Sequence, residues 1–193
     1  MKAYINFIFL CIVISFKKMI FIVNVFGKNE PVQNSTELMC ENRFWKIIEK
    51  TKSNSSENNG RQKTILKKEL YKLTNIEILE FDNKFRTFRG QACTWDLWAA
   101  SYTLNGGCSD NCFSQFRDWL IGNGQDIYKN AMVNAESLAE IEHDQNKYYM
   151  KVLNCAAREV YKEKTGGKEM PNGIRENLEI IEKKWNRKKT VIL

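Results

Sequence analysis

Apolar side chains recur at three- and four-residue steps along one stretch of this chain, and that period predicts an α-helix. The positions are Ile78, Phe81, Phe85, Phe88 and Ala92. They share one face of a helix with about 3.6 residues per turn, so the helix must bury that face in a core. Thr74-Asn75-Ile76-Glu77 comes just before and fits a capping box, in which the Thr hydroxyl and the Glu carboxylate satisfy backbone N–H groups.

The same period recurs in shorter stretches on both sides of this helix. We predict further helices over residues 41–52, 61–73, 95–104, 113–121, 127–131, 138–141, 149–160 and 174–185. The stretch 95–104 is apolar on most sides, which predicts a helix at the centre of the molecule. The last stretch carries Ile174 and Trp185 on one face, and we expect it to close over the core. Gly-Gly pairs at 106–107 and 166–167 end the helices before them.

The composition agrees with a helical fold. Two prolines in 193 residues, with 43% hydrophobic residues, favour helices over a many-stranded sandwich, which needs regular Gly and Pro turns. The length suits one domain with a sizeable core and is short for two. We expect an all-α fold, a single compact domain of about seven or eight helices over residues 39–189, with a C-terminal tail at 190–193.

Residues 1–38 form a separate hydrophobic leader with three interpretations. The apolar run at 3–16 has the length of a signal-peptide core and falls short of the ~20 residues that span a bilayer. Lys17 and Lys18 follow it at once, and no Ala-x-Ala-like cleavage site is present. A mis-assigned start, with translation from Met39 and a cytoplasmic protein, fits best. The alternatives are membrane association or export through the leader.

Charge and cysteine usage argue against two classes of function. The net charge is +7, but basic and acidic residues alternate, so a phosphate-tracking stripe is not evident and nucleic acid is disfavoured as a partner. The dense cluster at 183–189 fits a solvated helix end. Six unevenly spaced cysteines do not suggest a disulfide scaffold and are read as mostly reduced thiols. Cys108 and Cys112 lack partners for a metal site, so we expect no metal and no cofactor.

The least ordinary local chemistry surrounds the glycine turn at 105–110. A tight turn between two apolar helices can expose backbone donors and polar side chains together. The candidate binding residues there are Asp96, Trp98, Asn105, Cys108, Ser109, Asp110 and Arg117. The simpler interpretation is a structural corner, in which Ser109 or Asp110 caps the next helix and Arg117 pairs with Asp96 or Asp110.

No catalytic constellation emerges at this turn. A nucleophilic Cys108 would need a nearby base, and the only histidine, His143, lies in a distant polar stretch. Ser109 lacks the Gly-x-Ser-x-Gly elbow of a hydrolase nucleophile. We therefore assign no catalytic residues and lean towards a protein that is not an enzyme.

Several runs around the turn resemble a bacterial domain-of-unknown-function family, number 4240. They are Trp95-Asp96-Leu97-Trp98-Ala99-Ala100-Ser101-Tyr102, Asn105-Gly106-Gly107-Cys108-Ser109-Asp110 and Phe113-x-x-Phe116-Arg117-x-Trp119-Leu120-Ile121. Supporting runs begin at Asn42, Asn134 and Tyr161, so the resemblance covers nearly all of residues 41–171. It implies a cytoplasmic protein that begins near Met39, and it implies no activity.

One departure from the family pattern bears on metal binding. Where the family is expected to have Ser-Asp-Asp-Gly, this chain has Ser109-Asp110-Asn111-Cys112. A divalent-metal site that needs two adjacent carboxylates is therefore in doubt.

Two functional hypotheses follow. The first is a non-enzymatic helical module that binds or regulates a protein partner, since core signals are abundant and catalytic ones are lacking. The alternative is a small-molecule-binding domain or an enzyme with its site at the Asn105 to Asp110 turn. Contact with a membrane is expected only through residues 1–38.

Overall fold

The computed structural model describes residues 34–55, 59–141 and 153–176. Their helices run in the order α2 (Glu41–Ser53), α3 (Asn59–Tyr71), α4 (Asn75–Gln91), α5 (Trp95–Leu104), α6 (Asp110–Gly122), α7 (Gln125–Val133), the 3-10 helix η1 (Ala135–Glu140) and α8 (Ala156–Lys164). The described residues contain no strand. The predicted all-α class is confirmed, and the described residues contain eight helices, within the predicted seven or eight.

Helix α4 is the axis of the molecule. Its capping box is present: Glu77 N donates to Thr74 Oγ1, and Thr74 N donates to a Glu77 carboxylate oxygen. The apolar stripe from Ile78 to Ala92 is buried as predicted. Polar positions of α4 such as Asp82 and Asn83 are buried as well, so more than one face of this helix meets other elements.

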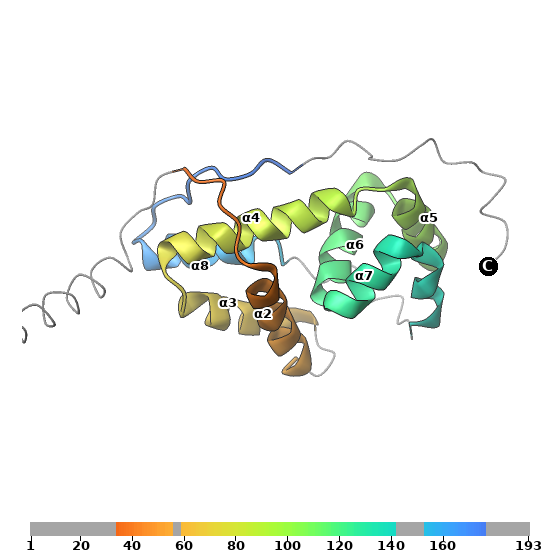
Figure 1. The fold of residues 1–193 in the computed structure, drawn as a ribbon, viewed down its shortest axis with the longest axis horizontal. Coiled ribbons are helices and arrows are strands. Elements are labelled where there is room, and N and C mark those ends of the chain that lie inside the picture. The colour runs from red at the N-terminus through yellow and green to blue at the C-terminus, as the bar shows by residue number, and fades with distance from the viewer. Residues whose placement is uncertain (1–33, 56–58, 142–152, 177–193) are drawn as a thin grey trace, which may run out of the picture.

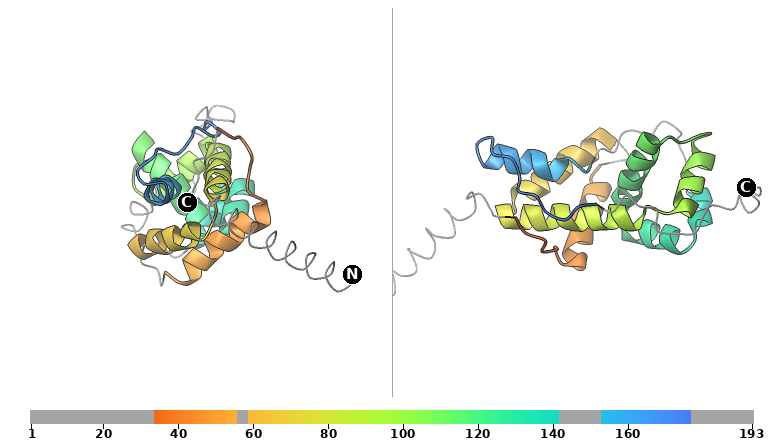
Figure 2. Two further views of the ribbon diagram at one scale, coloured as in Figure 1. Left: turned by 90° about the vertical axis from the view of Figure 1, so that its left-hand side faces the viewer. Right: turned by 90° about the horizontal axis from the view of Figure 1, so that it is seen from above.

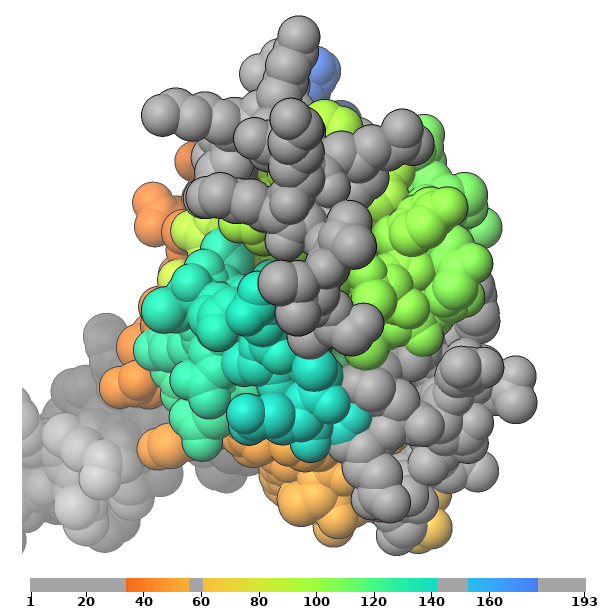
Figure 3. Space-filling view, turned by 90° about the vertical axis from the view of Figure 1, so that its right-hand side faces the viewer, coloured from red at the N-terminus to blue at the C-terminus, as the bar shows by residue number. Residues whose placement is uncertain are grey.

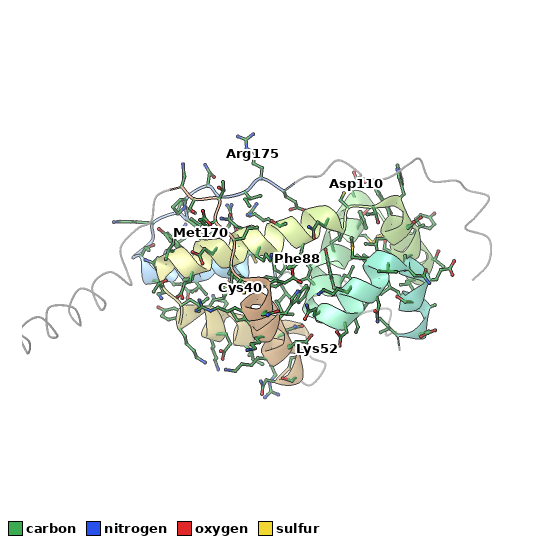
Figure 4. All side chains as sticks on the ribbon, viewed as in Figure 1. Cys40, Lys52, Phe88, Asp110, Met170 and Arg175 are labelled. Carbon is green, nitrogen blue, oxygen red and sulfur yellow. A yellow bond between two sulfur atoms is a disulfide. The ribbon has the colours of Figure 1, made fainter. Side chains whose placement is uncertain are left out.

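The helices form two groups joined by α4 (Figure 1). Helices α2, α3 and α8 pack around its first half, while α6 meets its second half and leads to α5, α7 and η1. Aromatic rings fill the space between the groups: Phe88 lies 5.2 Å from Phe44 and 5.2 Å from Tyr128, ring centroid to centroid. Burying each ring contributes about 1.5–3 kcal/mol. Figure 4 shows Phe88 at the middle of this packing.

Helix α5 lies at the periphery, so the prediction of a central α5 is wrong. Only Leu97, Ala100 and Ser101 are buried in it, and Tyr102 is 58% exposed. Figure 3 shows its atoms on the outer surface beside α7 and η1. Aromatic composition predicted a central helix, but two of its rings stack at the edge of the core, Trp95 on Trp98 at 5.7 Å.

The last described residues, 168–176, form a segment that we call the strap. After the terminator at Gly166 and Gly167, both with positive φ, the strap has no helix and follows α4 towards its C-terminal end (Figures 1 and 2). The predicted helix at 174–185 is therefore absent over 174–176, and its remainder lies outside the described residues. So do His143, Trp185, the basic cluster at 183–189 and the leader up to residue 33.

Within the described part of the chain, no helix is both long and apolar enough to cross a membrane.

Candidate functional site

The glycine turn is a corner whose conformation needs glycine. Gly106 and Gly107 have φ of 63° and 137°, a region that glycine adopts without steric strain, and the pair ends α5 as predicted. Gly107 N donates to Tyr102 O at 2.8 Å and so closes the end of α5. The turn then delivers the chain to Ser109, the N-cap of α6.

Most polar groups at this corner are engaged in the fold. The Asn105 amide donates to Ser101 O at 2.6 Å, and Ser109 Oγ accepts from Cys112 N at 3.4 Å, which confirms Ser109 as a cap. Trp98 Nε1 donates to Cys108 O at 3.1 Å while its ring stacks on Phe113. These contacts hold Trp98, Asn105 and residues 108–112 together, so their role at the corner is structural.

Cys108 and Cys112 are joined by a disulfide across the first turn of α6. The turn brings the two Cα atoms within 5.2 Å, a distance that a disulfide spans, although the cysteine spacing predicted mostly reduced thiols. Cys40, Cys93 and Cys155 remain thiols. Among the residues that the structure describes, no group of three or more His, Cys, Asp or Glu side chains is arranged to hold a metal ion.

The other predicted site residues, Asp96, Asp110 and Arg117, do not join this cluster. Asp96 and Asp110 are exposed at the first turns of α5 and α6, and Figure 4 places Asp110 at the far end of the molecule from the strap's start. Arg117 is buried and faces α4. Its Nη1 donates to Arg89 O at 3.0 Å and to Glu176 Oε1 at 2.8 Å, so the expected pairing with Asp96 or Asp110 is wrong.

The carboxylate of Glu176 lies between two buried guanidinium groups. Arg89 Nη1 is 2.5 Å from Glu176 Oε2, and Arg117 Nη1 is 2.8 Å from Glu176 Oε1. The side chains of Arg89, Arg117 and Glu176 are only 8%, 5% and 10% exposed. Each carboxylate oxygen thus accepts from a different arginine, an arrangement of charge-assisted hydrogen bonds. Ser114 Oγ accepts a further bond from Arg89 Nη2 at 2.7 Å.

One and a half turns earlier on α4, Asn83 holds the backbone of the same segment. Asn83 Oδ1 accepts from Ile174 N at 2.9 Å, and its Nδ2 donates to Ser35 O and Glu37 O. A Cβ on Gly173 would lie 1.8 Å from Asn83 Oδ1, so the close approach admits only glycine. We call Asn83, Arg89 and Arg117 the strap site.

Asp118 forms a second ion pair with Arg89. Its Oδ1 lies 2.6 Å from Arg89 Nε, and its Oδ2 accepts from Asn154 N at 3.2 Å. Burial raises the pKa of the Asp118 carboxyl from 3.8 to about 6, and the nearby Arg89 opposes that rise. A buried carboxylate costs free energy that its cationic partner offsets in part.

Sequence reasoning missed Asn83, Arg89 and Glu176. Arg89 and Glu176 are 87 positions apart, so no local spacing connects them. The one available signal was the run of polar residues inside a strongly apolar helix. Asp82, Asn83 and Arg89 interrupt or flank the stripe of α4, and a polar side chain beside a buried face needs a partner.

A family model described as "Protein of unknown function (DUF4240)" matches residues 39–163. No curated protein and no solved structure matches the chain. The matched region contains Asn83, Arg89 and Arg117 and ends before the strap.

Proposed function

The chain belongs to the DUF4240 family of proteins of unknown function, and we propose that it is a non-enzymatic interaction module whose strap site binds an extended segment of a partner protein through one carboxylate side chain. In the isolated chain, the strap occupies that site. The observation that carries this proposal is the Glu176 carboxylate held between the guanidinium groups of Arg89 and Arg117.

The strap is recognised through one backbone N–H, one glycine and one carboxylate, which a segment of a partner protein can also offer. Asn83 accepts a hydrogen bond from the backbone N–H of Ile174. It lies so close to Gly173 that this position admits only a residue without a side chain. Arg89 and Arg117 bind the carboxylate of Glu176, three residues after Gly173. Backbone bonds combined with a charged anchor are a common way to bind an extended peptide.

A covalent connection favours the strap over any free competitor. A tethered segment acts at an effective concentration on the order of millimolar when its linker is short. A partner segment therefore binds weakly until the strap is released or outcompeted. This property suits a regulatory module, whose availability depends on what displaces the strap.

The alternative site at the glycine turn has less support. The Asn105 Nδ2, the Ser109 hydroxyl and the Trp98 indole N–H are engaged in caps and turn contacts, and a small-molecule site needs polar groups that converge on open space. The strap site instead offers two cations that face one anionic group.

A peptide titration tests the proposal. A fluorescent peptide with the sequence of residues 168–178 is added to the full chain and to its Glu176→Gln and Glu176→Ala variants, each checked for folding by circular dichroism. We expect at least about tenfold tighter binding to either variant than to the wild type, because the internal competitor is weakened. The matched control is a peptide with Gln in place of the glutamate that corresponds to Glu176, with the glutamate at the position of Glu169 kept, and it should bind poorly.

Two results would overturn the proposal. One is the absence of peptide binding to both variants although they are folded. The other is equal binding of the Glu and Gln peptides, because that outcome would remove the role of the two arginines.

A further inference from the structure

A cavity of about 310 Å³ opens between α4 and the start of α8. Its lining residues are Phe85, Arg86, Arg89, Asn154, Cys155 and Arg158. Three of the six carry a guanidinium group and none carries a carboxylate. The volume is near the lower end of the range for small-molecule sites.

Two buried carboxylates, those of Asp82 and Asp118, pair with arginines of the cavity lining but do not line the cavity themselves. Arg86 uses its Nε to contact Asp82 Oδ2 at 2.6 Å, while Arg158 Nε is 3.9 Å from the same oxygen, beyond hydrogen-bond distance. Within the described residues, the Nη nitrogens of Arg86 and the guanidinium of Arg158 make no hydrogen bond, so they keep donors for another acceptor. On Arg89, the Asp118 carboxylate contacts the Nε.

The wall of the cavity itself carries positive charge. Its lining holds the three guanidinium groups of Arg86, Arg89 and Arg158 and no carboxylate. The carboxylates of Asp82 and Asp118 pair with Arg86 and Arg89 from outside the lining, and Arg158 also interacts with Glu169 of the strap. Burial raises the pKa of the Cys155 thiol, which keeps that lining group neutral at neutral pH.

We infer that this cavity binds a small phosphate monoester, with Arg86 and Arg158 on the phosphate and Phe85 beside its organic part. Convergent guanidinium groups suit a phosphate because it presents three acceptor oxygens and a charge near −2 at neutral pH. A single carboxylate presents only two oxygens. The apolar ring of Phe85 gives an organic group a surface that inorganic phosphate cannot use.

This site is distinct from peptide recognition, although Arg89 takes part in both. Its ligand is a small anion, and its main donors, Arg86 and Arg158, lie beside Asp82, whereas Arg89 and Arg117 hold Glu176 of the strap. Phosphate binding to a chain that binds no peptide would leave the present inference intact and remove the proposed function alone.

Calorimetric titration of the full chain provides the test, with phenyl phosphate, inorganic phosphate and citrate as probes at one ionic strength set with sodium chloride. We expect saturable binding of phenyl phosphate, weaker binding of inorganic phosphate, and at least about tenfold loss of affinity in Arg158→Ala, since charged hydrogen bonds are lost. Arg158 is half exposed on α8, so the variant should fold. Arg86→Ala is the second variant and should show a similar loss.

Arg43→Ala is the matched control, because it removes the same charge beside Glu77 at the far end of α4. It should leave the affinity unchanged. Three outcomes would overturn the inference: no saturable binding of phenyl phosphate, equal affinity in Arg158→Ala and the wild type, or binding of citrate alone.

Discussion

The buried carboxyl of Asp118 makes the stability of the domain depend on pH in an unusual direction. Its pKa is raised by burial from 3.8 to about 6, so the folded state holds this proton more tightly than the unfolded state does. Stability from Asp118 is fully present below pH ~3.8 and is lost as pH rises through about 6. Most paired surface carboxylates act in the opposite sense, because their pKa values are lowered.

We predict that the difference in unfolding free energy between the wild type and Asp118→Asn falls by on the order of 2–3 kcal/mol from pH 4 to pH 7. Asn is nearly isosteric and does not titrate, so the difference isolates Asp118. Urea unfolding at intervals of half a pH unit measures it. Parallel pH profiles for the two proteins would contradict the raised pKa.

Ser109 should matter to folding more than its exposed neighbour. Its Oγ caps α6 through Cys112 N, and loss of an N-cap costs about 0.5–2 kcal/mol. Ser109→Ala should therefore lower the free energy of unfolding by that amount, and Asn111→Ala, on the exposed side of the same turn, by less than about 0.5 kcal/mol. Thermal melting compares them, and equal losses would show that the cap is unimportant.

At the scale of elements, α7 begins with a cap that another helix supplies. Gly124 has φ of 97° and no capping side chain, and Glu49 Oε1 of α2 accepts from Gln125 N at 2.8 Å. A Cβ on Gly124 would lie 2.1 Å from that same oxygen, whereas one on Gly106 would meet nothing within 4 Å. Two glycines with positive φ thus differ in their surroundings.

Gly106→Ala should cost about 1 kcal/mol from backbone strain alone, and Gly124→Ala about 2 kcal/mol because Glu49 is also pushed from its cap. In a Glu49→Ala background, the cost of Gly124→Ala should fall to that of Gly106→Ala. Denaturant unfolding of the double-mutant cycle measures the coupling. Simple additivity would mean that Glu49 does not cap α7.

In the molecule as a whole, features set by neighbouring residues could be predicted from the sequence, and contacts between distant segments could not. The capping box at Thr74 and the terminator at Gly166 depend on neighbouring residues, so the sequence predicted the ends of α4 and α8. The position of α5 depends on which of its apolar faces meets α6, and no local pattern specifies that choice. The contact between Arg89 and Glu176 joins distant segments and needed the folded chain.

The domain boundary at Met39 remains a prediction that the chain itself can test. Residues 39–193 should fold without the leader, as judged by circular dichroism. Residues 34–193 should be more stable by about 1–3 kcal/mol, because the buried Asn83 amide otherwise loses Ser35 O and Glu37 O as acceptors. Thermal and urea unfolding compare the two lengths. An unfolded product from residues 39–193 would contradict the boundary.

In the proposed function, the strap is an exchangeable occupant of its site and not an inseparable part of the core. Hydrogen exchange at the Ile174 amide tests it directly, because that N–H donates to Asn83. In Glu176→Gln we predict exchange at Ile174 at least about tenfold faster than in the wild type, with the buried Phe85 amide of α4 unchanged, as expected for local opening. If both amides accelerate together, the strap and the core unfold as one unit and the account is wrong.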